Sequence, residues 1–338
     1  MRILSWNCQG ARAEPTTRRI EEMHKMYSPS FMFLCETKND RSFMEDKQTS
    51  LGYDNLFTVE PKGNNNDGGL ALFYSNDYPV HILASDDHLI DTETVIDGNR
   101  VFMTFVYGDP VVKCRQYVWE RLTRIGIARS DACWFIIGDF NEITGNHEKR
   151  GGKKRSENSF LPFRAMIQAC GFIDFPFQGN QFSWKGQRTN GNIRSQLDRA
   201  MGNKEWHNIF PHTNVEYLKM WGSDHRPLLA SIPSSLKKKF MLDKRRSGKA
   251  GLKEAMMEGW CVKGSHENHH PLSKKIQNSQ RIISFGKKST QTNAEKLIKE
   301  LQNKIDETYE DILAPPETLL DLKLRLCDAY KEEGTFWF

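Results

Sequence analysis

The sequence predicts an α/β (α+β) fold with largely antiparallel or mixed β-sheets, followed by a helical C-terminal extension. Many short apolar segments are separated by turn residues, and only a few helical patterns lie between them. Strands and helices do not alternate regularly, which disfavours a doubly wound parallel sheet. After residue 232 the strand patterns stop, and a basic segment precedes long stretches with helical periodicity.

Composition limits the class of protein before any motif is considered. The 338 residues are 38% hydrophobic and 27% charged, which is typical of globular proteins. A net charge of +5 is compatible with a polyanionic partner. The seven cysteines include no CxxC pair, which favours free thiols over disulfides or a structural zinc site. No apolar run suits a signal peptide or a membrane span, so we expect a soluble intracellular protein, nuclear or cytoplasmic and not secreted, without a membrane partner.

The first half of the chain reads as a series of strands with two helices. A turn at Asp97-Gly98 is typical of a hairpin. Apolar residues at helical spacing predict helices over 17–27 and 116–127. The predicted strands are 1–6, 31–34, 53–59, 70–74, 80–83 and 101–107.

The segment 134–137 is the clearest strand, because four large apolar residues follow one another without a polar break. Gly138 ends it, and Asp139 and Asn141 follow two residues apart, so that in an extended backbone their side chains point the same way. Such a pair at a strand end suits a hydrolytic site, and it suits an Asx turn equally well.

The remainder of the chain contains further strands, a loop and a helical tail. Residues 145–155 are polar and glycine-rich, which predicts a loop whose basic residues either contact phosphates or are simply solvated. Residues 161–169 form a predicted helix, residues 181–184 a short strand that leads into a loop, and 196–201, 215–218 and 228–232 further strands. Two amphipathic helices separated by Pro315-Pro316 predict a helical hairpin.

This pattern divides the chain into three parts. We expect a catalytic domain over 1–235, a basic linker over 236–290 and a helical hairpin over 291–338. Short basic runs at 237–239 and 244–246 are weak nuclear signals. The three aromatic residues 336–338 at the end of the sequence suggest a continuation into another domain. The oligomeric state is not predicted.

Polar residues of types suited to phosphate hydrolysis stand at the ends of the predicted strands. Each one alone is explained as well by a turn, a cap or a surface ion pair, but their joint occurrence favours a shared site. They are Asn7, Glu36, Tyr107, Asp139, Asn141, Asp198, Asp224 and His225.

Phosphodiester chemistry gives these residues distinct roles. A hard cation, Mg²⁺ or Mn²⁺, neutralises the phosphate, and Glu36 is the best candidate ligand, with Asn7 offering a neutral carbonyl. Asp224 is a second ligand or a member of the network. Asp139 is suited to orient or deprotonate the attacking water.

The other residues are suited to contact the phosphate. Asn141 and Tyr107 can donate hydrogen bonds to phosphoryl oxygens, as can a protonated His225. Asp198 could hold the imidazole in the required tautomer.

Five motifs in this order resemble the endonuclease/exonuclease/phosphatase superfamily, whose fold is a four-layered α/β sandwich of two packed mixed β-sheets. The motifs are Ser5-Trp6-Asn7-Cys8-Gln9-Gly10, Leu34-Cys35-Glu36-Thr37-Lys38, Gly138-Asp139-Phe140-Asn141, Gln196-Leu197-Asp198-Arg199 and Gly222-Ser223-Asp224-His225-Arg226-Pro227. The resemblance covers about the first 235 residues and implies the metal, water-activating and phosphate-contacting roles just given.

Within that superfamily the chain is most similar to the endonuclease domain of plant non-LTR (LINE-type) retrotransposons. The segments 105–110, 138–143 and 148–152 carry this likeness. In those elements a reverse transcriptase follows the nuclease, and this chain lacks it. Gln9 stands where apurinic-site repair relatives often have an acidic residue, which makes a dedicated repair role less favoured.

The resemblance implies a Mg²⁺-dependent endonuclease that nicks one strand of double-stranded DNA. A phosphatase of the same superfamily acting on a small phosphoester is the first alternative. A relic that binds nucleic acid or a protein partner without catalysis is the second. The sequence contains no readable code for a preferred DNA target.

Overall fold

The computed structural model describes residues 1–62, 67–188, 191–234, 252–260, 275–276, 278–279, 281–282, 293–311 and 315–335. Two compact units make up the chain, Met1–Leu236 with Tyr309–Leu313, and Lys237–Thr308 with Ala314–Phe338. Several expectations lie outside the described residues: the two basic runs, most of the linker and the aromatic end.

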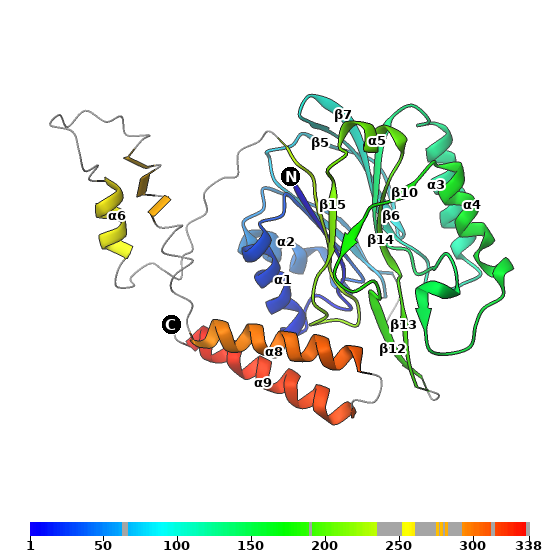
Figure 1. The fold of residues 1–338 in the computed structure, drawn as a ribbon. Coiled ribbons are helices and arrows are strands. Elements are labelled where there is room, and N and C mark those ends of the chain that lie inside the picture. The colour runs from blue at the N-terminus through cyan, green and yellow to red at the C-terminus, as the bar shows by residue number, and fades with distance from the viewer. Residues whose placement is uncertain are drawn as a thin grey trace. The chain divides into compact units, whose positions relative to one another are not determined.

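The first unit contains a seven-stranded mixed sheet (Figure 1). Its strand order is β11 (Phe177–Gln178), β15 (Asn214–Tyr217), β16 (Leu228–Ser231), β1 (Arg2–Asn7), β2 (Phe31–Cys35), β4 (Leu70–Tyr74) and β3 (Asn55–Val59). The pairs β1–β2 and β11–β15 are parallel, and the other neighbours are antiparallel.

A second sheet has six strands and is also mixed. Its order is β10 (Ile173–Asp174), β14 (Asp198–Gly202), β8 (Cys133–Asp139), β7 (Asn99–Tyr107), β6 (Leu89–Ile96) and β5 (Val80–Asp86). Only β7 and β8 run parallel among these neighbours. Asp97 and Gly98 join β6 to β7 with positive φ angles of 50° and 81°, so the predicted hairpin is confirmed.

Side-chain alternation along the strands explains why the two sheets pack face to face. Phe33 of β2, Phe105 of β7 and Phe135 of β8 belong to one buried cluster between the sheets. Their strand neighbours, such as Met32 and Trp134, point to the outer faces. Burial of apolar residues on both faces of a strand requires a covering layer on each side.

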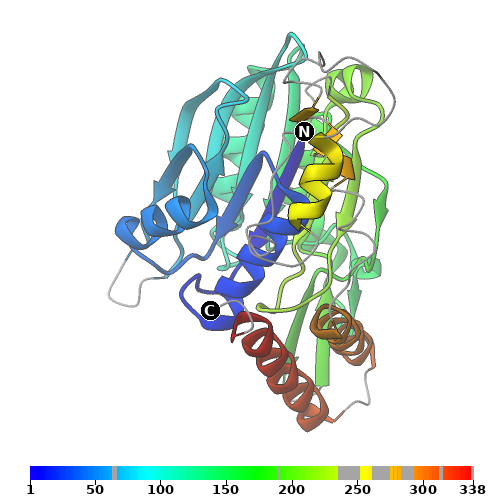
Figure 2. The same ribbon diagram turned by 90° about the vertical axis from the view of Figure 1, so that its left-hand side faces the viewer.

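Helices supply the two outer layers (Figures 1 and 2). On the first sheet lie α1 (Glu14–Tyr27) and α2 (Arg41–Leu51), and on the second lie α3 (Arg115–Ile127) and α4 (Leu161–Ala169). The predicted four-layered α/β sandwich is therefore confirmed.

A third, three-stranded sheet corrects two loop predictions. It joins β12 (Trp184–Arg188), β13 (Gly191–Ser195) and β9 (Lys149–Arg150). These strands are polar and lack alternating apolar residues, so the sequence pattern indicated loops, whereas backbone pairing needs no apolar side chains. The sequence also failed to predict α2 and α5 (Lys204–Ile209), two further short strands, β10 and β11, and two 3-10 helices, Asn146–Glu148 and Glu157–Phe160.

The second unit contains the predicted helical extension, α8 (Asn293–Glu310) and α9 (Pro316–Thr335), which lie side by side. The Gln302 side-chain amide donates to the Tyr330 hydroxyl at 2.9 Å, which links the two helices. Pro316 opens α9, a position where its missing N–H costs no hydrogen bond. A further helix, α6 (Leu252–Trp260), lies within the range expected to be a linker. None of the helices in the described ranges has the length and apolar character of a membrane span.

Candidate active site

The second sheet places three polar side chains next to one another at one edge of the sandwich. Along β8, Phe135 and Ile137 point into the inter-sheet core, and Asp139 continues the same row. In the sheet register Asp139 lies opposite Tyr107 of β7 on one side and Asp198 of β14 on the other. Tyr107, Asp139 and Asp198 therefore lie next to one another at the same edge, or rim, of this sheet.

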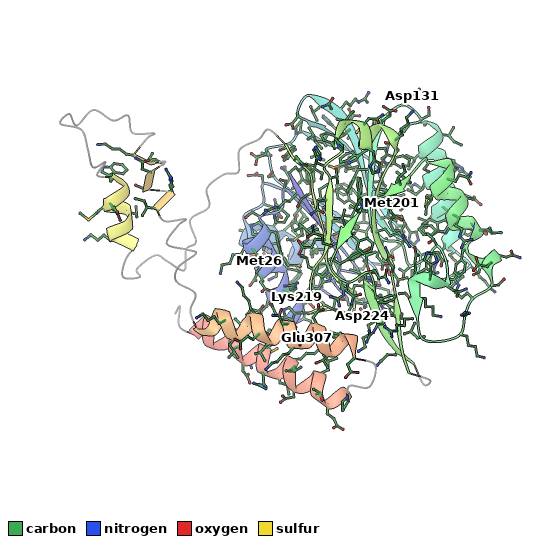
Figure 3. All side chains as sticks on the ribbon, in the orientation of Figure 1. Met26, Asp131, Met201, Lys219, Asp224 and Glu307 are labelled. Carbon is green, nitrogen blue, oxygen red and sulfur yellow. The ribbon has the colours of Figure 1, made fainter. Side chains whose placement is uncertain are left out.

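The first sheet brings its own polar residues to this rim. Asn7 is the last residue of β1, and it lies beside Cys35, the last residue of the parallel strand β2. Glu36, the next residue after Cys35, therefore lies at the same edge of the sheet as Asn7. His225 precedes β16, which runs antiparallel to β1 and so begins where β1 ends. Figure 3 shows Asp224 at the end of the sandwich opposite Asp131, which precedes β8.

Asn7 connects the carboxylates of the two sheets. Its Nδ2 donates to Glu36 Oε1 at 3.1 Å and to Asp139 Oδ2 at 2.9 Å. The Tyr107 hydroxyl donates to the same Glu36 oxygen at 2.8 Å. Asn7 Oδ1 accepts the Gln9 N–H at 3.3 Å, so its amino group faces the carboxylates. Asn7 therefore acts as a bridge here, and its predicted metal contact stays a prediction.

His225 lies between two buried carboxylates. Its Nδ1 is 3.0 Å from Asp198 Oδ2, and its Nε2 is 3.8 Å from Asp139 Oδ2. All three side chains are at most 3% exposed. The Ser183 hydroxyl accepts the backbone N–H of Asp198 at 2.9 Å and so fixes the start of β14. This geometry holds the imidazole in one orientation, as the sequence suggested for Asp198.

Burial and neighbouring charge set the protonation states. Burial raises the pKa of Asp139, and the nearby His225 opposes that rise only in part. Burial alone would lower the pKa of His225, but the carboxylates of Asp198 and Asp139 outweigh it and raise that pKa. Burial disfavours the ionised form of Glu36, yet hydrogen bonds from Asn7 and Tyr107 lower its pKa overall. The lowered pKa of Glu36 and the raised pKa of His225 therefore favour their charged forms, whereas the raised pKa of Asp139 makes its carboxylate a stronger base.

The donor set at this rim fits a hard divalent cation. Among the described residues, Asp139, Asp198 and His225 form a group whose ligand atoms all lie within 4.8 Å of one another. Asp198 and His225 already hydrogen-bond each other, whereas the Glu36 side chain is 13% exposed and reaches the surface. Carboxylate oxygens are the ligands that Mg²⁺ and Mn²⁺ prefer. Glu36 therefore offers the more accessible carboxylate for such an ion.

Two predicted residues lie at the rim with partners that the sequence did not reveal. The Asn141 backbone N–H donates to Asp139 Oδ1 at 2.8 Å, and its side chain donates to the Gly108 carbonyl at 2.9 Å. Asp224 Oδ2 accepts the Trp184 indole N–H at 3.0 Å. No described hydrogen bond or ion pair joins Asp224 to Glu36 within the residues that the structure covers, so its metal role stays a prediction.

Sequence reasoning missed two residues that complete the site. Lys38 Nζ lies 3.1 Å from Glu36 Oε2, and a lysine two residues after a strand-end carboxylate was the available signal. The Ser223 hydroxyl donates to the Asn7 carbonyl at 2.8 Å and accepts the His225 N–H at 3.2 Å. Ser223 stands in the motif 222–227, but nothing in the sequence assigned it a role, because one of its partners is more than two hundred residues away and the other belongs to its own backbone turn.

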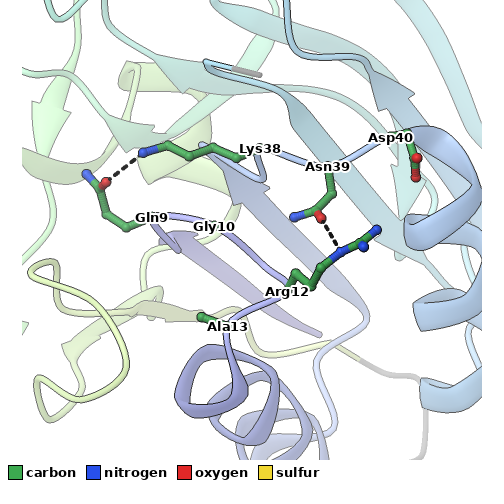
Figure 4. A pocket seen from close by; sticks show the side chains of 7 residues that line it. All are labelled: Gln9, Gly10, Arg12, Ala13, Lys38, Asn39 and Asp40. Carbon is green, nitrogen blue, oxygen red and sulfur yellow. Dashed lines mark hydrogen bonds between the residues drawn. The ribbon is translucent and has the colours of Figure 1, made fainter. Parts of the chain in front are cut away.

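A cavity of about 510 Å³ is lined in part by Lys38, the residue that pairs with Glu36. Lys38 and Arg12 face it, held by hydrogen bonds of 3.1 Å to the side chains of Gln9 and Asn39, respectively (Figure 4). Its lining residues are Gln9, Gly10, Arg12, Ala13, Lys38, Asn39 and Asp40. Two cations at one cavity suit a negatively charged ligand.

Solved structures with the same fold include several nucleases. The endonuclease domain of TRAS1, a telomere-specific non-LTR retrotransposon, has 12% identity and a TM-score of 0.52, covering 70% of this chain and 99% of its own. The AP endonuclease LMAP from Leishmania major has 17% identity and a TM-score of 0.53, covering 68% and 86%. The 3'-5' exonuclease NExo from Neisseria meningitidis has 18% identity and a TM-score of 0.51, covering 69% and 99%.

At these identities the solved structures establish the fold alone. No curated protein matches the sequence. The family signature matches residues 4–225, which span every polar residue assembled at the rim. The chain belongs to the Endonuclease/Exonuclease/phosphatase family.

Proposed function

We propose that this protein is a divalent-metal-dependent DNA endonuclease, derived from a LINE-type retrotransposon, that nicks one strand of double-stranded DNA by water attack on a backbone phosphate. The observation that carries the proposal is the convergence of Glu36, Asp139 and His225 at one rim. Asn7 bridges Glu36 to Asp139, and Asp139 lies 3.8 Å from His225. Such a site offers a general base, a proton donor and a cation site that could act on the same phosphate group.

Asp139 and His225 divide the proton chemistry in this proposal. A raised pKa makes the Asp139 carboxylate a stronger base toward a water molecule. The imidazolium of His225 donates to a phosphoryl oxygen and stabilises the charge that develops there, while Asp198 positions the ring.

Glu36 and Asn7 would hold Mg²⁺ or Mn²⁺, with Asp224 as a further ligand or network member. The bound ion would neutralise the phosphate and favour the charged transition state. Asn141 would contact the phosphoryl oxygens, and Tyr107 would do so by exchanging its hydrogen bond to Glu36 for one to the phosphate.

The positive charges around the site favour DNA over a small phosphoester. Arg12 and Lys38 face the same cavity, and Lys38 pairs with Glu36. Arg150, Lys153 and Lys154 are exposed on the segment that follows the catalytic strand. Charges spread in this way match a chain of phosphates better than a single one. Proteins of the same fold include the TRAS1 retrotransposon endonuclease domain and a 3' phosphatase bound to a product DNA hairpin.

A plasmid-relaxation assay with Mg²⁺, and with EDTA as a negative control, tests the proposal. We expect Asp139→Asn and His225→Gln each to reduce nicking by about 10²- to 10⁴-fold, the usual contribution of a positioned proton-transfer group. Glu157→Gln, which removes an exposed partner of Arg164, should leave the rate unchanged.

Three outcomes would each contradict the assignment. Undiminished nicking in both site variants would show that the rim is not the catalytic centre. Hydrolysis of inositol phosphates without any nicking of DNA would support the small-phosphoester alternative. Binding to DNA without turnover in any divalent metal would support a non-catalytic relic.

A further inference from the structure

Glu142, the residue after Asn141, lies almost fully buried beside the catalytic strand. Its side chain is 4% exposed, and all of its acceptor positions are occupied. Oε1 accepts the Ile143 backbone N–H at 2.9 Å and Arg155 Nη1 at 2.5 Å. Oε2 accepts Arg115 Nη1 at 3.0 Å and Arg155 Nη2 at 3.1 Å. Four donors for one carboxylate satisfy it completely, as a buried charge requires.

The first guanidinium anchors the loop between β7 and α3. Arg115 opens α3, and its Nε and Nη2 donate to the carbonyls of Asp109 and Pro110 at 2.9 and 3.2 Å. Its third nitrogen reaches Glu142. This loop begins directly after Tyr107 and carries Val111 and Val112, which are exposed. Arg115 therefore joins the backbone of this loop to the end of the catalytic strand.

The second guanidinium anchors the basic segment after the catalytic strand. The Asn146 side chain donates to the Arg155 carbonyl and accepts its N–H, both at 2.8 Å, so the two ends of segment 146–155 are held together. That segment carries the exposed cations Arg150, Lys153 and Lys154. The Arg155 guanidinium then joins the closed segment to Glu142.

We propose that Glu142 is a positioning residue for DNA binding, because its carboxylate fixes these two loops to each other and to the strand that ends in Asp139. The inference rests on the proposed function, since it assigns the two loops as contacts for DNA. Glu142 itself touches no substrate. Removing its charge weakens the bonds to both guanidinium groups at once, which loosens both loops together.

A buried ion pair on β6 of the second sheet provides the matched control. Asp91 is 3% exposed and binds both Nη atoms of Arg129, at 2.8 and 2.5 Å. It also accepts a hydrogen bond from Thr104. Arg129 is two residues from Asp131, at the end of the sandwich opposite Asp224 (Figure 3). Asp91→Asn therefore removes an equally buried carboxylate without touching either loop.

The test compares Glu142→Gln and Asp91→Asn by two readouts in the full chain. Hydrogen exchange, followed by mass spectrometry in EDTA, should become faster in peptides covering 108–114 and 146–155 in Glu142→Gln alone. The Kd for a duplex of about 20 base pairs, measured in EDTA, and the KM for nicking should each rise about tenfold, whereas kcat should stay nearly unchanged. A tenfold rise is the effect of one charge-assisted hydrogen bond to a phosphate that a loosened loop no longer makes.

A purely structural role would give a different result. If both variants lose similar thermal stability but Kd, KM and loop exchange do not differ between them, the inference is overturned. If wild-type protein cleaves no DNA, the proposed function fails, yet the exchange readout still decides whether Glu142 fixes the two loops.

Arg155→Met covers the case in which Glu142→Gln does not fold. The Arg155 side chain is 27% exposed, so its loss is better tolerated, and Arg115 still neutralises Glu142. Faster exchange in 146–155 and a raised Kd are expected, with peptides over 108–114 unchanged. Arg155→Lys should restore part of the affinity through one remaining hydrogen bond to Glu142. Unchanged exchange and Kd in Arg155→Met would contradict the inference.

Discussion

At the scale of single residues, the site is a set of mutually dependent hydrogen bonds. Asn7 satisfies two carboxylates at once, and the Ser223 hydroxyl ties Asn7 to His225. Asp198 and Asp139 lie on the two sides of the His225 ring. Asn7, Asp139, Asp198 and His225 are buried, so each would cost free energy without its partners. Side chains of this kind are fixed before substrate arrives, which is what electrostatic catalysis requires.

Asp198→Asn should lower the pKa of His225, because Asp198 is the charge that contributes most to raising it. Since folding raises this pKa, protonation of His225 stabilises the folded protein fully below its ordinary value of about 6.5, and that stability is lost as pH rises through the folded value. In the variant this contribution should be smaller, and its loss should be complete at a lower pH.

Histidine NMR in EDTA measures this shift, and a His225→Gln spectrum identifies the resonance among the ten histidines. An unchanged titration in Asp198→Asn would mean that the carboxylate does not act on the ring.

At the scale of elements, the ends of β7 and β8 are joined by close backbone contact. The Gly108 N–H donates to the Asp139 carbonyl at 2.7 Å, and a Cβ at Gly108 would lie 2.1 Å from the Phe140 carbonyl oxygen. The Asn141 side-chain amide also donates a hydrogen bond to the Gly108 carbonyl oxygen. Only glycine fits where two strand ends approach this closely. The relative positions of Tyr107 and Asp139 depend on this contact.

Gly108→Ala should therefore separate the two strand ends and reduce kcat by about 10²-fold, as misplacement by about 1 Å can do. Overpacking should also lower the free energy of unfolding by about 1–3 kcal/mol. Nicking kinetics and urea denaturation measure the two effects.

Gly171→Ala is the control, because Gly171 has a φ of 63° and a Cβ added there would meet no atom within 4 Å. It should cost about 1 kcal/mol through backbone strain and leave kcat unchanged. Equal kcat values for the two variants would contradict the role given to the Gly108 contact.

At the scale of the first unit, charge is distributed unevenly around a fixed sandwich. The two sheets bury their apolar faces against each other and against the outer helices, so the polar strand ends and loops carry the remaining chemistry. Lys153 and Lys154 are exposed on the segment after β8. By contrast, Lys47 of α2 pairs with Glu21 of α1 in an outer layer.

DNA binding should weaken with salt, because bound phosphates release counterions. Replacing Lys153 and Lys154 together by Gln should reduce the slope of log Kd against log salt by about 1.8, which is about 0.9 for each phosphate that the lysines no longer neutralise. Fluorescence anisotropy with a duplex in EDTA gives the slope. Lys47→Gln should leave it unchanged, and an identical slope in the double variant would exclude these lysines from the interface.

The sequence by itself predicted many of the strands and helices and the identity of the polar residues, because unbroken apolar runs, helical spacing and short motifs are local properties. The buried segment 134–137, the Asp97-Gly98 hairpin and the helices after residue 293 all follow from such patterns. The four-layered architecture was implied only by the family resemblance that the motifs carry. Polar strands such as β12 and β13 carry no such signal, and their pairing emerged only in the folded chain.

Only the tertiary structure decided how the site residues act together. Asn7 presents its amino group to two carboxylates, and Glu142 joins two loops. Both arrangements depend on contacts between side chains from separate segments. Such contacts are set by the register of strands and the packing of two sheets. No local sequence pattern encodes these contacts, because each one joins residues from separate segments of the sequence, which meet only in the folded protein.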